Sequence, residues 1–138
     1  MSEAGVDFDA LVEEAKQTGT DEAMSRLWAA TYALPQWNFI ARGELPNVRP
    51  FIGVMEDRPF LMAFTDSAHA RAFGERQGFL APDGSLQLLA MPVAGFVETA
   101  ASYAAGGVFG IMFNNGPHGY FAPLSNVRPM YDFHVLKK

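Results

Sequence analysis

The segment from Pro59 to Phe64 constrains the fold more than any other part of the chain. One side of it carries Phe60, Met62 and Phe64, and the other side carries Leu61 and Ala63. A short continuous apolar run of this kind, bounded by polar residues, is typical of a buried β-strand. Because both sides are apolar, we expect this strand to lie inside a sheet that is covered on both faces. Such a sheet needs helices to cover it, so the segment predicts a mixed α/β domain.

Helices and strands are predicted on either side of this segment. Apolar spacing predicts helices over residues 8–17, 21–34, 66–77 and 92–105. Residues that favour helix ends flank them: Asp7, Thr20 and Thr65 as N-caps, and Gly78 as the end of the third helix. Further strands are predicted over residues 37–41, 48–55, 85–91, 108–113 and 120–122, and Pro123 opens a last short helix or turn.

Together these elements predict the fold class α/β (α+β). We expect a single domain over residues 1–138, in which helices pack on a mixed sheet of about five strands. The polar break at residues 56–58 suggests a hairpin, so part of the sheet is antiparallel. No internal repeat or low-complexity linker interrupts the chain.

The charge is unevenly distributed and argues against nucleic acid as a partner. The net charge is −5, and residues 1–44 hold eight acidic and three basic side chains. The arginines are scattered singly, whereas a nucleic-acid binder clusters its basic residues to displace counterions from phosphates. The acidic helical surface has two interpretations: it steers a basic protein partner, or it is a solvated surface that keeps the protein in solution.

Composition also excludes some chemistry and suggests a location. The chain has no cysteine, which excludes disulfides, cysteine-based zinc sites and thiol catalysis. No apolar run approaches the roughly 18 residues that a membrane helix needs. The start, Met1 to Asp9, is acidic, so we expect no signal peptide, no membrane partner and a cytoplasmic location.

We find no motif for catalysis, metal or cofactor binding. Asp66 and His69 have i, i+3 spacing on one helix, and Asp132 and His134 would share a strand face, but neither pair matches a known ligand pattern. There is no Gly-x-Ser-x-Gly elbow and no Gly-x-Gly-x-x-Gly helix start. We therefore expect no metal, no cofactor and no catalytic residue, with His69 on a helix surface and His134 in the tail.

The loop over residues 114–119 is the best candidate for a ligand site. It follows a buried strand, and ligands of α/β sheets tend to bind beyond such carboxyl ends. Its candidate ligand-binding residues are Asn114, Asn115, His118 and Tyr120. The alternative is a plain turn in which Asn and Gly adopt left-handed backbone geometry and nothing binds.

An aromatic group offers a candidate interface. Trp28, Trp37 and Phe39 are close in sequence, and core packing is the default interpretation for such residues. If Trp37 is exposed, then Trp37, Phe39 and Arg42 form a candidate interface, because Trp and Arg dominate binding hot spots.

Two stretches resemble the N-terminal domain of the SseB family, of the enhanced-serine-sensitivity type. The first is Arg58-Pro-Phe-Leu-Met-Ala-Phe-Thr-Asp-Ser-Ala-His-Ala-Arg-Ala-Phe, a strand followed by Phe-Thr-Asp and a helix. The second is Gly110-Ile-Met-Phe-Asn-Asn-Gly-Pro-His-Gly, similar to the family's strand and its Asn-Pro-Gly-like turn, although here Asn115 and Gly116 precede Pro117. The likeness covers roughly residues 20–130. It implies a bacterial cytosolic α/β domain whose biochemical role is not established, with no catalytic residues to carry over.

The sequence therefore favours a non-enzymatic binding or interaction module, with a protein partner or a second copy of the chain. One alternative is an acidic dimeric protein of the chaperone or immunity type. The other is a small hydrolase that uses His118 with Asn114 and an acid from elsewhere.

Overall fold

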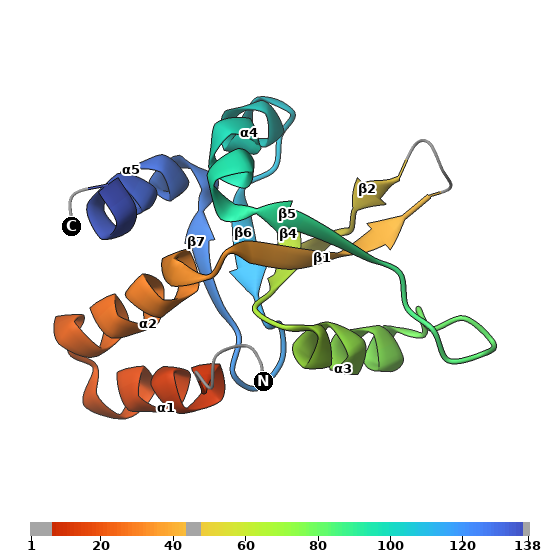
Figure 1. Cartoon of the computed structure of the whole chain (residues 1–138), viewed down its shortest axis with the longest axis horizontal. Coiled ribbons are helices and arrows are strands. Elements are labelled where there is room, and N and C mark those ends of the chain that lie inside the picture. The colour runs from red at the N-terminus through yellow and green to blue at the C-terminus, as the bar shows by residue number, and fades with distance from the viewer. Residues whose placement is uncertain (1–6, 44–47, 137–138) are drawn as a thin grey trace.

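One mixed sheet organises the molecule (Figure 1). The computed structural model describes residues 7–43 and 48–136. In these residues the sheet has seven strands: β1 (Gln36–Arg42), β2 (Arg49–Pro50), β3 (Ile52–Met55), β4 (Arg58–Phe64), β5 (Leu88–Pro92), β6 (Gly110–Phe113) and β7 (Tyr120–Pro123). The predicted fold class is confirmed, although the sheet has more strands than we expected.

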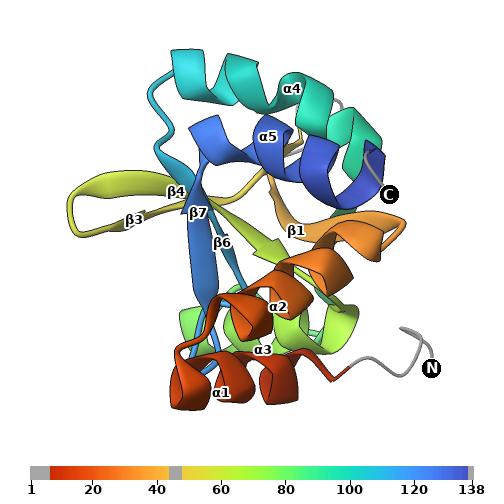
Figure 2. The ribbon, with the colours of Figure 1, turned by 90° about the vertical axis from the view of Figure 1, so that its left-hand side faces the viewer.

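Helices cover both faces of the sheet. The described helices are α1 (Phe8–Thr18), α2 (Asp21–Ala33), α3 (Ser67–Gln77), α4 (Val93–Ala105) and α5 (Val127–Tyr131). The core clusters place α2, α4 and α5 on one face and α3 on the other. Figure 2 shows α1 packed beside α2, and α5 beside α4. None of the described helices is long and apolar enough to cross a membrane.

Strand β4 is central, as its two apolar sides predicted. It pairs antiparallel with β1 and β3 and parallel with β6. Leu61 and Ala63 join the larger core under α2, α4 and α5. Phe60, Met62 and Phe64 join a smaller core under α3. Burial on both sides is the physical reason that this strand lacks a polar face.

The predicted strand over residues 48–55 is divided at Phe51. The part before Phe51, β2, pairs with β1, and the part after it, β3, pairs with β4. Phe51 hydrogen-bonds to both β1 and β4: its N–H donates to the Ile40 carbonyl, and its carbonyl accepts from the Met62 N–H. A two-residue turn then joins β3 to β4, with φ of 50° at Glu56 and 65° at Asp57. Positive φ at both positions is the geometry of the predicted hairpin turn, here without the glycine that usually allows it.

The helix caps confirm two predictions and correct one. The side chains of Asp7 and Thr20 accept hydrogen bonds from the first turns of α1 and α2. We expected Thr65 to cap α3, but Asp66 does so, accepting from the His69 N–H at 2.8 Å. The cap moves by one residue because the Thr65 hydroxyl is already hydrogen-bonded to Asn114.

The C-terminal segment is helical and not extended. A short 3₁₀ turn, Leu124–Asn126, leads into α5, as Pro123 predicted, and a π-helical turn, Asp132–Leu136, follows. The expectation that Asp132 and His134 share a strand face is therefore wrong. The physical reason is packing, because the His134 ring stacks on Tyr32 of α2 at 6.0 Å between ring centroids.

Trp37 and Phe39 are core residues. Both side chains are fully buried, and the Trp37 ring lies 4.9 Å from that of Phe113. The interface interpretation required an exposed Trp37, so the structure excludes Trp37 and Phe39 as surface anchors. Arg42 alone of that set is exposed, and its guanidinium lies 4.2 Å from the centroid of the Phe79 ring.

Candidate functional site

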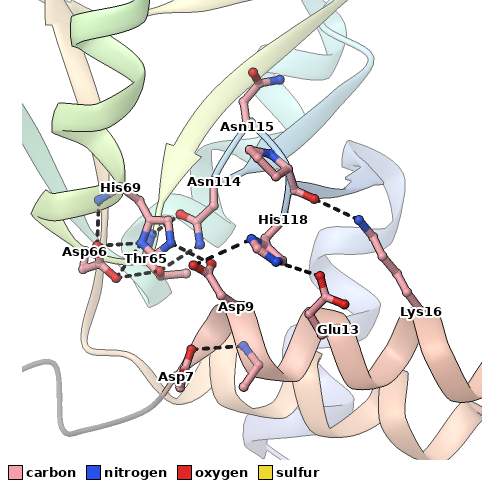
Figure 3. A network of polar contacts seen from close by, with 12 residues as sticks. Asp7, Asp9, Glu13, Lys16, Thr65, Asp66, His69, Asn114, Asn115 and His118 are labelled. Atoms are coloured by element: carbon pink, nitrogen blue, oxygen red, sulfur yellow. Dashed lines mark hydrogen bonds and ion pairs between the residues drawn. The ribbon is translucent and has the colours of Figure 1, made fainter.

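The parallel strands β4 and β6 end side by side, and the residue after each strand begins the site. Asn114 follows β6 and Thr65 follows β4. The Asn114 side-chain carbonyl accepts from the Thr65 N–H at 3.0 Å, and its amide donates to the Thr65 hydroxyl at 3.0 Å. The Asn114 backbone N–H donates to the Ala63 carbonyl at 2.9 Å. Asn114 therefore joins the two strand ends (Figure 3).

This bridge occupies the amide that we expected to contact a ligand. Asn114 is only 3% exposed. Its φ is 53°, in the left-handed region that Asn tolerates better than most residues. The predicted turn geometry is thus present, and the side chain holds the sheet edge together from inside.

His69 lies between two carboxylates. Its Nδ1 is 2.7 Å from Oδ1 of Asp66, and its Nε2 is 2.9 Å from Oδ1 of Asp9 on α1. An imidazole donates from both nitrogens only when it is protonated. His69 is therefore a half-buried bridge between α3 and α1, and the expectation of a simple surface residue is wrong.

The electrostatics of this bridge favour charge on His69 and on Asp66. The hydrogen bond to Asp66 raises the pKa of His69 to about 9; burial opposes this shift, and Asp9 adds to it. For Asp66, burial alone would raise the pKa, but the hydrogen bonds and positive charge of His69 together lower it. At neutral pH the bridge is therefore an imidazolium between carboxylates.

His118 extends the bridge along α1. Its Nε2 lies 2.8 Å from Oε2 of Glu13, and its Nδ1 lies 3.7 Å from Oδ2 of Asp9. Carboxylates and imidazoles thus alternate in what we call the carboxylate–imidazole chain: Asp66, His69, Asp9, His118 and Glu13. The chain joins α3, α1 and the loop between β6 and β7 (Figure 3).

One face of α1 supplies Asp9 and Glu13 to this chain. Asp9, Glu13 and Lys16 have i, i+4, i+7 spacing, and the Lys16 ammonium donates to the Pro117 carbonyl at 2.9 Å. The neighbouring face carries Phe8, Val12 and Ala15, which are buried. The helix is therefore docked by a polar stripe and an apolar stripe that run side by side.

The other two predicted ligand residues lie apart from this chain. The Tyr120 hydroxyl is 2.8 Å from that of Thr31 in the core, and burial raises the pKa of Tyr120. The side-chain amide nitrogen of Asn115 lies 3.4 Å from the sulfur of Met55, and the Asn115 backbone carbonyl accepts from the Arg76 guanidinium at 2.7 Å. Of the four predicted residues, Asn114 and His118 thus belong to the polar network, and Tyr120 and Asn115 do not.

The carboxylates and imidazoles of this network can form hydrogen bonds and ion pairs and can exchange protons. Its one hydroxyl, that of Thr65, is buried and hydrogen-bonded to Asp66 at 3.2 Å. Within the described ranges no group of three or more His, Asp or Glu side chains is arranged to hold a metal ion. The polar groups mainly satisfy one another.

A second candidate site lies at the start of β4, on the face that α3 covers. A cavity of about 260 Å³ opens there between the β3–β4 hairpin and β7. We call it the hairpin pocket, and its lining residues are Met55, Glu56, Arg58, Phe60, Met112 and Phe121. Phe121 forms one wall and is 52% exposed. The pocket is apolar, with one acid and one base at its mouth.

Sequence reasoning located the 114–119 loop but missed the partners of its residues, and it missed the hairpin pocket, for identifiable reasons. The contacts of His69 with Asp9 and of His118 with Glu13 span 60 and 105 residues of chain. The spacing of Asp9 and Glu13 on one helix face was the available signal. For the pocket, no local pattern marks Phe121 of β7 as exposed, because its exposure depends on how the β3–β4 hairpin and β7 are arranged in space.

No protein-family model matches this chain, and no curated protein matches it either. The likeness to the SseB N-terminal domain remains a prediction.

Proposed function

We propose that this protein is a non-enzymatic interaction module that receives an apolar side chain of a partner protein in the hairpin pocket. The exposed wall of Phe121 is the observation that carries this proposal. A large aromatic side chain in the wall of an open concave site is typical of surfaces that have a partner.

The size and lining of the pocket support a side chain as its occupant. Its volume of about 260 Å³ is below the range of about 300–1,000 Å³ that is usual for small-molecule sites. Met55 and Met112 line it, and the flexible, polarisable methionine side chain adapts to different apolar groups.

The charges at the mouth suggest what flanks that side chain. Arg58 has no carboxylate partner among the described residues, and its guanidinium lies 4.4 Å from the centroid of the Phe109 ring. An arginine held against an aromatic ring is a frequent hot spot. We therefore expect a partner that places an Asp or Glu beside its apolar residue.

Photo-crosslinking in the native host tests this function. A photoreactive phenylalanine analogue is placed at position 121, and a matched control carries it at Met24, an exposed apolar residue on α2. We expect a discrete crosslinked product from position 121 and none from position 24. Arg58→Glu should reduce the yield, because it would repel an acidic flank.

Equal products at both positions, or none at position 121, would contradict the proposal. A product of twice the chain mass from position 121 would mean that a second copy occupies the pocket.

The hydrolase alternative has less support. His118 does meet the carboxylates of Glu13 and Asp9, as that mechanism requires. However, the hydroxyl within the network belongs to Thr65, whose side chain is buried and already hydrogen-bonded.

A further inference from the structure

The C-terminal turn, Asp132–Leu136, holds a large aromatic side chain outside the fold. Phe133 is 63% exposed, more than any other aromatic residue in the described part of the chain. The turn itself is anchored, because Val135 packs against the larger core and the His134 ring stacks on Tyr32. Phe133 is therefore presented outward from a fixed place on the surface.

The residue before Phe133 is an acid that has free hydrogen-bonding capacity. The Asp132 side chain is 39% exposed, and its Oδ1 lies 3.5 Å from Nε of Arg128. Neither of its carboxylate oxygens accepts a hydrogen bond within the described chain. An exposed apolar side chain with an acid beside it is what the hairpin pocket and its arginine are expected to receive.

We propose that the hairpin pocket of one copy of this chain receives Phe133 of a second copy, with Asp132 of that copy beside Arg58. This inference rests on the proposed function, because it names the partner of the same pocket. The β3–β4 hairpin and the C-terminal turn lie on opposite sides of the molecule (Figure 2). The contact is therefore head-to-tail, and it extends into a chain of copies or closes into a ring.

The pocket suits an aromatic ring. Its volume of about 260 Å³ gives room for one large side chain. Two of its walls, the rings of Phe60 and Phe121, meet at 90° with their centroids 5.5 Å apart. Aromatic rings favour such edge-to-face contacts, so an inserted Phe133 ring extends an arrangement that is already present.

The charges at the mouth of the pocket complement those of the C-terminal turn and its neighbour. Arg58 and Glu56 line the mouth, and neither makes an ion pair within the described chain. Asp132 supplies the acid for Arg58, and Arg128 supplies the base for Glu56, so acid and base alternate across the contact. The net charge of −5 makes two copies repel one another. At physiological ionic strength that repulsion is screened beyond about 8 Å, whereas the contact pairs are closer.

Sedimentation of the purified chain tests the pairing. One ring and a few exposed charges make a weak contact, so we expect association with a dissociation constant of about 0.1–1 mM. Phe133→Ser should raise this constant about tenfold or more, because it removes the central anchor. The matched control is Val54→Ser, which removes another exposed apolar side chain and should associate like the native chain.

Mixing two defective variants identifies the two surfaces. Arg58→Glu impairs the pocket and keeps Phe133, whereas Phe133→Ser keeps the pocket. Each variant alone should associate at least about tenfold more weakly than the native chain. An equimolar mixture should recover the native affinity but stop at a 1:1 pair, because both outer ends of that pair are defective. If circular dichroism shows that Phe133→Ser is unfolded, Asp132→Asn takes its place, since it removes the charge and keeps the shape.

A native chain that stays monomeric up to about 1 mM would overturn this inference. So would association that Phe133→Ser and Asp132→Asn leave unchanged, or a mixture of variants that forms no pair. The proposed function is judged separately by the crosslink at position 121 in the host. A different protein captured there, with a monomeric purified chain, would support the pocket as a binding site and reject the second copy as its partner.

Discussion

The two ends of the β4–β6 strand pair are built in opposite ways. At the carboxyl end, Thr65 and Asn114 hydrogen-bond to each other, and the carboxylate–imidazole chain closes over the edge. At the amino end of β4, the hairpin pocket and β3 leave apolar side chains exposed. At the polar end the side chains are paired with one another, whereas at the apolar end groups remain exposed.

This difference cautions against reading polar residues as a site. Buried polar groups are costly unless they are paired, so a fold that gathers them at a sheet edge tends to satisfy them internally. Exposed Phe121 and Val54 gain no such compensation within the described chain. Of the two ends compared here, the apolar one leaves exposed groups among the described residues, and we expect binding there.

Between the two ends, the larger effect is expected from breaking the closed end. Asn114→Ala removes both side-chain hydrogen bonds to buried Thr65 and places at φ 53° an alanine, which tolerates the left-handed region less well than asparagine. We expect a loss of about 3 kcal/mol in the free energy of unfolding, measured by urea denaturation. Asn115→Ala is the control and should cost less than about 0.5 kcal/mol. Equal losses would show that Asn114 is not the bridge.

The second effect is a pH dependence from the same end. The pKa of His69 is about 9 in the folded chain against 6.5 ordinarily. Because its pKa is higher in the folded chain, protonated His69 contributes its full stabilisation of the folded state below pH 6.5. That contribution is lost as the pH rises through 9. We expect the free energy of unfolding to fall by about 2 kcal/mol across this window, after allowing for the part of the ring that water reaches.

His69→Gln serves as the control, since it keeps a hydrogen-bonding side chain and does not titrate. Its free energy of unfolding should vary less between pH 6.5 and 9. A native protein that is equally stable at both pH values would mean that the bridge is not charged.

The smallest effect sharpens the comparison from the open end. Phe121→Ser removes an exposed ring, so the free energy of unfolding, measured by thermal denaturation, should fall by less than about 0.5 kcal/mol. Phe113→Ser, in the fully buried core, should cost about 3–5 kcal/mol. Comparable losses for the two variants would place Phe121 in the core.

Much of the fold followed from local pattern. Leu61 and Phe60 give β4 one apolar side each, and this pattern correctly predicted a central strand. Asp7 and Thr20 correctly predicted the starts of two helices. The division at Phe51 did not follow, because it depends on where β1 and β4 each end. The capping role of Asp66 did not follow either, because Asn114 engages Thr65 from the next strand.

For the candidate site, the sequence located the region and not the roles. The 114–119 loop does lie beyond parallel strand ends, and Asn114 has the expected left-handed backbone. His118 contacts Glu13 of α1, which lies 105 residues earlier in the chain. Local spacing carries no information about such a pairing.

The order of synthesis also determines when α1 can form its contacts with the β6–β7 loop. Its polar partners on the β6–β7 loop are synthesised 105 residues after Glu13. At about 5–20 residues per second, the ribosome delivers His118 roughly 5–20 s after it delivers Glu13. During that interval α1 has acidic groups but no histidine partner on that loop. The contacts of α1 with that loop can therefore form only late in synthesis, although the helix itself is the first described element to be translated.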